Sequence, residues 1–253
     1  MRKLLFRNGD GRFGAIGIGA MIVFIAMVLV AGVAASVIIN SSNAVQIQAL
    51  DTGQETTKEV SSGLCVFEIA GKVNGTNDLN NLSITVKARP GSGDIDINNS
   101  YILMSDGTSK SLLRYNYVNA SLASNEALSS LGQTFVTKAS ANGDLFEFMN
   151  ESAWANLNNE TFGMAVIQDY DSSVTAYNPV INRGDKVALF IRCGAIPRDY
   201  AETWGGHFTY GLFGREIPER TDVFGRVIPE VGAPGVISFT APMSYVDTIY
   251  TLQ

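Results

Sequence analysis

The longest apolar stretch of the sequence constrains the fold more than any other feature. Residues 15–50 contain no charged side chain, and from Ala15 to Ile39 the only polar side chain is that of Ser36. An α-helix needs about 20 apolar residues to cross a bilayer, so this stretch is long enough. The five residues 21–25, Met-Ile-Val-Phe-Ile, cover more than one turn. The helix is therefore apolar on every face, and lipid or protein must surround it.

The segment in front of this helix, residues 1–14, is short and basic, with a net charge of +3. A secretory signal has an apolar middle of about 7 to 15 residues followed by a small-residue cleavage site, and this apolar stretch is too long for that pattern. A positive segment before an apolar helix stays inside the cell, so we expect the remainder to lie outside the cytoplasm. That remainder carries a net charge of −9. An acidic surface repels phosphate, which argues against nucleic acid as a partner.

The helix is predicted to continue in a more amphipathic form to Ser61, with Gly63 as its C-cap. Gly53 costs about 1 kcal/mol relative to alanine in a helix, so a break at that position is an open alternative. Gly32 and Ser36 form a small-x-x-x-small pair that lets two helices approach closely, and Phe24 lies in the same apolar stretch. From spacing alone, a membrane anchor and a helix-packing surface both remain open.

The sequence pattern of residues 62–253 is typical of β-structure. Short runs of alternating or apolar residues are separated by turn clusters, which predicts a β-sandwich. The strand over residues 82–87 is predicted to be half-buried, with Ser83, Thr85 and Lys87 facing solvent. One short helix is expected over 125–131. The predicted strands are 64–69, 82–87, 101–104, 112–118, 135–138, 145–149, 162–168, 186–192, 236–240 and 244–252.

The chain offers little for catalysis or for metal binding. His207 is the only histidine, and its aromatic surroundings favour a packed side chain. Asp94, Asp96 and Asn98 are weak candidates for Ca²⁺, because a solvated outward face is the commoner outcome, and the same holds for Asp169 and Asp171. One histidine and two cysteines are too few for a zinc site. We expect no enzyme, cofactor or resident metal.

Cys65 and Cys193 lie in apolar, strand-like runs. Outside the cell they are candidates for a disulfide, with two buried free thiols as the alternative.

Asn-x-Ser/Thr sequons are more numerous than the roughly three expected by chance. Seven occur, and that of Asn40 lies within the predicted helix. The N-glycosylation candidates are the other six, Asn74, Asn81, Asn98, Asn119, Asn150 and Asn159. Incidental matches in an Asn- and Ser-rich exterior are the alternative.

The sequence resembles the archaellins, the filament subunits of the archaeal flagellum (archaellum). The leader is similar to a class III, type IV pilin-like signal, which is cut before the apolar helix. In this chain the cut would follow Arg12-Phe13-Gly14, and Ala15 would start the mature protein with Gly17 at its third position. The resemblance also covers Asp51-Thr-Gly-Gln-Glu-Thr-Thr, Ile181-Asn-Arg-Gly-Asp-Lys-Val, Val227-Ile-Pro-Glu-Val-Gly-Ala-Pro-Gly-Val and the closing Leu252-Gln253.

The resemblance implies an α+β chain in three parts. Residues 1–14 are a leader that is removed, 15–61 a hydrophobic helix in the filament core, and 62–253 an immunoglobulin-like antiparallel β-sandwich in the outer shell. It implies N-glycosylation, self-association into a helical homopolymer, and a leader peptidase, a membrane platform and an assembly ATPase as partners. The filament would be extracellular, with only the precursor in the cytoplasmic membrane.

Two alternatives share parts of this pattern. An adhesive type IV-like pilus subunit has the same leader and helix, but the archaellin-like tail argues against it. A membrane-anchored extracytoplasmic enzyme or binding domain would not need the amphipathic extension at 41–61, and the sequence lacks a catalytic constellation for it.

Overall fold

The computed structural model of the chain describes residues 11–73, 78–117, 134–136, 145–149, 153–154, 156–194 and 211–253. It divides into two compact units, Met1–Glu55 and Thr56–Gln253, and each is described by itself. The sequon asparagines Asn74, Asn119 and Asn150 lie outside the described residues. So do His207 and the helix expected over 125–131.

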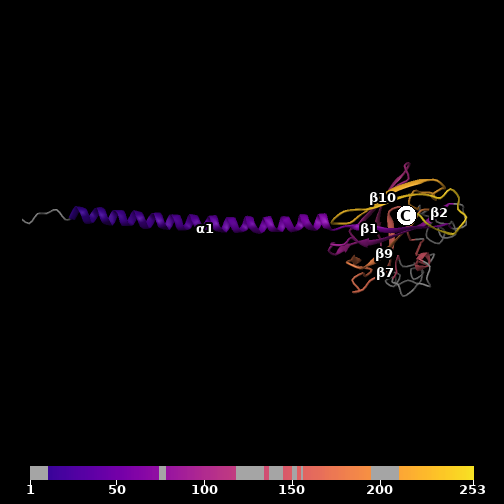
Figure 1. Cartoon of the computed structure of the whole chain (residues 1–253), viewed down its shortest axis with the longest axis horizontal. Helices are drawn as coiled ribbons and strands as arrows, with labels where there is room; N and C mark the ends of the chain where they lie inside the picture. The colour runs from indigo at the N-terminus through magenta and orange to yellow at the C-terminus, as the bar shows by residue number, and fades with distance from the viewer. Residues whose placement is uncertain are drawn as a thin grey trace, which may run out of the picture. The chain divides into compact units, whose positions relative to one another are not determined.

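One helix, α1 (Gly11–Ser61), contains the whole apolar stretch. It begins four residues before Ala15 and ends at Ser61 as predicted. Figure 1 shows it as one continuous coil, and the alternative of a break at Gly53 is wrong. At the end of α1 the Ser62 N–H donates a hydrogen bond of 2.8 Å to the Lys58 carbonyl, which closes the last turn.

The second unit is built of β-strands, most of them paired antiparallel. They are β1 (Leu64–Val73), β2 (Leu79–Ala88), β3 (Ile95–Asp96), β4 (Tyr101–Ser105), β5 (Lys110–Tyr115), β6 (Phe135–Val136), β7 (Thr161–Gln168), β8 (Val180–Ile181), β9 (Lys186–Arg192), β10 (Asp222–Ile228), β11 (Gly235–Thr240) and β12 (Ile249–Thr251). A short 3₁₀ helix, η3 (Leu145–Phe148), lies between β6 and β7.

The main sheet has the order β11-β10-β4-β5-β7-β9-β2-β1-β12, and β3 pairs with β8 separately. All its pairings are antiparallel except β5–β7 and β6–β7, which are parallel. Its two halves face each other across one apolar core. Members of that core include Ile102, Leu113 and Val227 from one half, and Ile69, Ile84 and Leu189 from the other. The predicted class, a long N-terminal helix followed by a β-sandwich, is confirmed.

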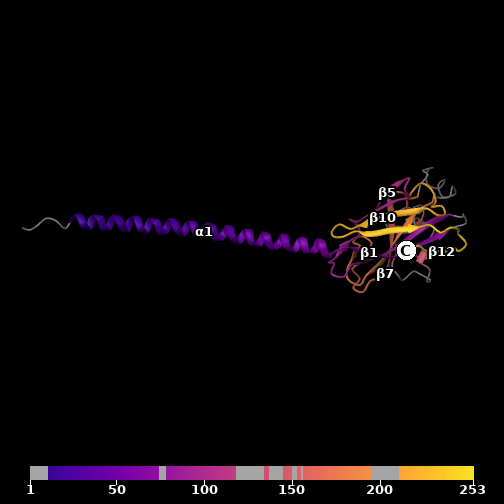
Figure 2. The ribbon, with the colours of Figure 1, turned by 45° about the horizontal axis from the view of Figure 1, so that its top comes forward.

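The early strand β1 lies beside the C-terminal strands, although they are far apart in sequence (Figure 2). Gly63 forms a bridge with Ala233, whose carbonyl accepts a 3.1 Å hydrogen bond from the Leu64 N–H. A Cβ on Gly63 would lie 2.6 Å from that Ala233 carbonyl oxygen. The glycine therefore serves this close approach of two backbones, a role that its prediction as a C-cap did not include.

The outer face of β1, β2, β7 and β9 is covered by a second apolar cluster. Ala165 and Ala188 on the strands pack with Phe146, Met149 and Trp154 from the segment between β6 and β7. Trp154 meets the ring of Phe190 edge-on, with centroids 5.2 Å apart.

That cover corrects the prediction for the outward positions of β2. Ser83 and Thr85 were expected to face solvent, but they are 0% and 5% exposed. β2 is a strand, as its alternating sequence predicts, but both faces of this strand are buried over most of its length.

Three more elements differ from the prediction. The strand expected over 145–149 is instead the 3₁₀ helix η3, in which Phe146 is buried, and Met149, buried as well, follows it directly. The strand β10 was missed, since Gly225 interrupts its apolar pattern. The strand expected over 244–252 is confined to β12.

Candidate assembly surface

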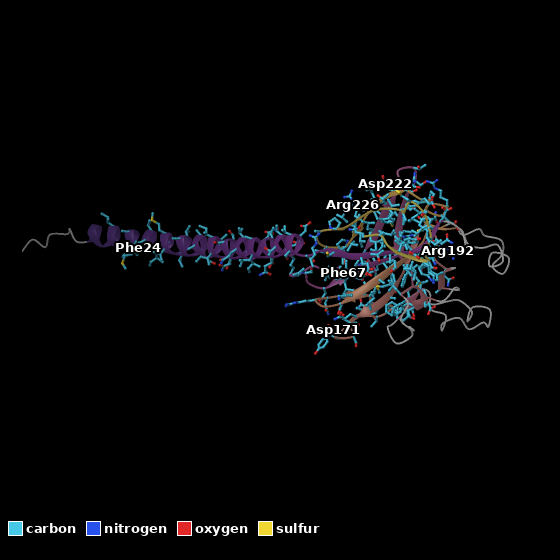
Figure 3. The ribbon with its side chains drawn as sticks, turned by 45° about the vertical axis from the view of Figure 1, so that its right-hand side comes forward. Phe24, Phe67, Asp171, Arg192, Asp222 and Arg226 are labelled. Carbon is cyan, nitrogen blue, oxygen red and sulfur yellow. The ribbon has the colours of Figure 1, made fainter. Side chains whose placement is uncertain are left out.

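The apolar residues of α1 are exposed on every side. Eighteen large apolar side chains between Ile16 and Leu50 are each 53–70% exposed. Figure 3 shows these side chains, Phe24 among them, projecting from the helix. A single copy of the chain thus leaves its most apolar segment without any cover, which costs about 25 cal/mol for each Å² exposed to water.

No steric contact within one copy of the chain requires a glycine at three positions of α1. A Cβ placed on Gly14, Gly17 or Gly32 would meet nothing within 4 Å. A glycine in a helix costs about 1 kcal/mol relative to alanine, so these positions weaken the isolated helix. Together with Ser36, the glycines provide flat places where another helix can approach closely.

By length and composition, α1 is also able to cross a membrane, over Ile16–Ser61. The two surroundings that the sequence leaves open, lipid and other helices, both satisfy its apolar surface. The structure therefore identifies the apolar surface of α1 as the surface that lipid or other helices must cover.

The residues of the predicted processing site lie in the first turns of α1. Arg12, Gly14, Ala15 and Gly17 are all helical, and Gly14 and Gly17 are exposed. The bond between Gly14 and Ala15 thus lies in the first turns of the helix, before Ile16.

Three of the predicted sequons fall on described residues. Asn98 and Asn159 are exposed in loops, whereas Asn81 is half-buried in β2. Asn81 is paired with Lys72 of β1 on one side and Arg192 of β9 on the other. A glycan is therefore much easier to accommodate at Asn98 and Asn159 than at Asn81.

The two cysteines are free thiols, so the candidate disulfide is wrong, and of the alternative, two buried free thiols, only Cys193 is buried while Cys65 is half-buried. Cys65 pairs with Lys87 at one end of β2, and the Cys193 N–H donates to the Asn80 carbonyl at the other. Seven residues of strand separate these points, about 23 Å, whereas the Cα atoms of a disulfide lie within about 7 Å.

The weak metal candidates around Asp96 are occupied with local hydrogen bonds. The Asp96 carboxylate accepts from the Asn98 N–H at 2.8 Å and from the Asn99 amide at 3.4 Å. Asp94 and Asn98 are exposed to solvent. The Asp96 carboxylate thus stabilises the local turn that follows β3.

The structure brings together a different set of carboxylates. One oxygen each of Asp169, Asp171 and Asp185 lie within 4.8 Å of one another. Asp185 is 1% exposed, and its Oδ1 has no hydrogen-bond partner. The Asn182 side chain donates to Asp171 and thereby lowers the pKa of that carboxyl. These oxygens have the chemistry of a site for a hard cation such as Ca²⁺. Asp169 and Asp171 are candidates from the sequence alone. Nothing in the sequence pattern points to Asp185, which comes from a different turn.

Comparison with known proteins gives one consistent result. The sequence model of the archaeal-type flagellin family matches residues 14–239. Flagellin B2 of Methanocaldococcus jannaschii is 40% identical over 249 residues, 98% of this chain and 98% of that protein. Flagellin B3 of Thermococcus kodakarensis is 36% identical over 256 residues, 95% of this chain and 97% of that protein.

Two solved structures resemble the fold. The crystal structure of archaeal flagellin FlaB1 from Methanocaldococcus jannaschii has a TM-score of 0.54 and 28% identity, covering 76% of this chain and 97% of that chain. The archaeal flagellum of Methanospirillum hungatei strain JF1 has a TM-score of 0.53 and 16% identity, covering 93% of this chain and 98% of that chain. With its match over nearly the whole length of known flagellins, the chain belongs to the archaeal-type flagellin family.

Proposed function

We propose that the chain is the structural subunit of an archaeal flagellar filament, and that copies of α1 pack together in the filament core. The observation that carries this proposal is the uncovered apolar surface of α1, which is exposed on all sides from Ile16 to Leu50. Each large apolar side chain gains about 1.5–3 kcal/mol when it is fully buried. Eighteen such side chains in each copy make the assembled core very hard to dissociate.

The contact between copies is of the head-to-tail kind. Such a contact does not close on itself, so it extends into a helical polymer. The chain contributes to swimming motility as the structural subunit of this polymer, and it carries out no catalysis itself. An adhesive pilus subunit and a membrane-anchored enzyme or binding domain are both disfavoured, because the chain belongs to the flagellin family.

The route to the filament begins in the cytoplasmic membrane. The precursor holds α1 in lipid, with the basic residues 1–14 on the inner side. A leader peptidase cuts between Gly14 and Ala15, with Arg12 and Gly17 as recognition positions. A membrane platform and an assembly ATPase then add the mature chain to the extracellular filament. Because α1 has no charged residue from Phe13 to Leu50, its transfer from lipid to protein exposes no charge to an apolar surrounding.

Among the sequons on described residues, the two exposed ones, Asn98 and Asn159, are the positions that we expect to carry N-glycans. Both lie in loops of the β-unit, where a glycan displaces no strand pairing.

One experiment tests the proposal directly. Material sheared from the cell surface is sedimented, and its intact mass and N-terminal sequence are measured. We expect sedimentable filaments of a chain that begins at Ala15, with added mass in units of sugar. A chain that begins at Met1 and remains a detergent-soluble monomer would contradict the proposal.

A further inference from the structure

Two lysines are paired directly across β2 and β9. Lys87 and Lys186 are partners in the antiparallel register, and both are half-buried. Like charges directly opposite each other destabilise a sheet. Among the described residues, neither lysine has a carboxylate within 4.0 Å. Within the described part of the β-unit, these two adjacent positive charges therefore have no ion-pair partner.

Phe67 lies over both of these lysines. The register of β1 against β2 shifts between Val66 and Glu68, so Phe67 is the extra residue of a β-bulge. Bulges commonly redirect a side chain, and this ring is 55% exposed (Figure 3). Its centroid lies 4.9 Å from the Lys87 ammonium and 5.5 Å from that of Lys186. Phe67, Lys87 and Lys186 together are called the Phe67 patch below.

The opposite charge lies on α1. Asp51, Glu55 and Glu59 follow one another at intervals of four residues, so they form one stripe along the helix, and all three are exposed. Like charges at this spacing destabilise a helix, and acidic residues near a helix C-terminus also oppose its dipole. Lys58 offsets only one of the three charges. In a single copy this acidic stripe is locally unfavourable, as is the pair of lysines.

The two surfaces also match in spacing. Successive carboxylates of the stripe lie about 6 Å apart along the helix axis. Directly opposed residues in an antiparallel sheet have Cα atoms about 4.5–5.5 Å apart. Two paired lysines can therefore face two successive carboxylates of one helix, with the exposed ring of Phe67 against the helix surface between them.

We propose that the Phe67 patch of one copy binds the stripe Asp51, Glu55 and Glu59 of α1 from a second copy. This inference rests on the proposed filament function, and adds a specific contact between the core helix and the outer unit. Each copy supplies one stripe and one patch, so the contact repeats along the polymer without closing. Charge complementarity of this kind sets the register of an interface and disfavours wrong partners.

The test is an exchange of charges, with the full chain produced in an archaeal host that lacks its own flagellins. One variant carries Lys87→Glu and Lys186→Glu, a second carries Glu55→Lys and Glu59→Lys, and a third carries all four substitutions. A control with Lys110→Glu and Arg114→Glu makes the same change of net charge at exposed positions of β5. Sedimented filaments are quantified, and circular dichroism in detergent checks that each variant is folded.

We expect the two double variants to lose filaments when produced alone, because each would then bring like charges together. Filaments should return in the fourfold variant, and also when the two double variants are produced together. The control should assemble as the unmodified chain does. Normal filaments from either double variant alone, or none from the fourfold variant, would overturn this inference while leaving the filament function intact. Failure of the unmodified chain to form filaments would instead contradict the proposed function.

Discussion

The side-chain oxygen of Gln253 accepts a hydrogen bond of 3.0 Å from the backbone N–H of Ser238. The last residue of the chain thus contacts β11, and the backbone of the same tail pairs with β1. The Ile69 N–H donates to the Gln253 carbonyl at 3.0 Å, and the Leu252 N–H donates to the Ile69 carbonyl at 2.7 Å. The C-terminal residues therefore link β1 with β11.

Substitution Gln253→Ala should lower the free energy of unfolding by about 1 kcal/mol, because it removes one hydrogen bond at this junction. Leu252 packs against the main core, so Leu252→Ala should cost more, about 2 kcal/mol. Urea unfolding of the full chain in detergent measures both changes. Met243→Ala, at a side chain that is 73% exposed, is the matched control and should change the free energy little. Equal stability of all four proteins would contradict a stabilising role for the tail.

Substitution Gly32→Leu should block filament assembly and leave the β-unit folded. In one copy a Cβ added at Gly32 meets nothing within 4 Å, so we expect the isolated helix to be undisturbed. Between packed helices it would push two backbones apart. The yield of sedimented filaments measures the effect, with Val33→Leu as a control that changes little volume on the same helix. Normal filaments from the Gly32→Leu chain would rule out close helix packing at this position.

The sequence was sufficient for α1, because its apolar run is long and uncharged, and for most strands, because their apolar residues alternate or cluster in short runs. It was insufficient where the reason for a residue lies in a distant segment. Gly225 reads as an interruption of β10, yet a Cβ there would lie 2.4 Å from the Leu103 carbonyl of β4. Ser83 reads as a solvent position, but it is buried between Ala70 and Phe190, its partners on the neighbouring strands, which pack in one cluster with Trp154.

The same limit applies to the candidate sites. The apolar helix could be recognised from composition, since all its exposed residues are contiguous in sequence. The Phe67 patch could not, because it depends on a bulge in β1 and on the register of β2 with β9. A one-residue change of register would place either lysine on the opposite face of the sheet.

The two thiols should differ sharply in reactivity. Cys65 is half-buried, whereas Cys193 is buried in the core. We expect a maleimide to label Cys65 in the folded chain and Cys193 only after unfolding. Mass spectrometry without reductant should count two free thiols in denaturant. A chain that yields none would contradict the separation of the cysteines along β2.

Burial raises the pKa of the Cys193 thiol from 9.0 to about 12, with the positive charge of Arg192 opposing this shift. In the unfolded chain the thiol ionises above its usual pKa, while the folded chain keeps it neutral. Its contribution to stability is therefore complete below about pH 9 and is lost as the pH rises toward about 12. The urea midpoint of the unmodified chain should fall more steeply over this range than that of Cys193→Ala. Cys65→Ala is the control, and equal slopes for the unmodified chain and Cys193→Ala would contradict the prediction.

The acidic cluster of Asp169, Asp171 and Asp185 should make stability depend on a divalent cation. The buried Oδ1 of Asp185 lacks a donor, and an unsatisfied buried oxygen costs about 1–3 kcal/mol, more when it is charged. A cation bound only by the folded chain removes this cost, and calcium at 100 times its dissociation constant stabilises by about 2.7 kcal/mol. Thermal unfolding of the full chain in detergent, with calcium or with chelator, measures the difference. Asp185→Asn should abolish the response to calcium, whereas Asp94→Asn, at an exposed position outside the cluster, should retain it. An unmodified chain that unfolds at the same temperature with calcium and with chelator would exclude a cation from this cluster.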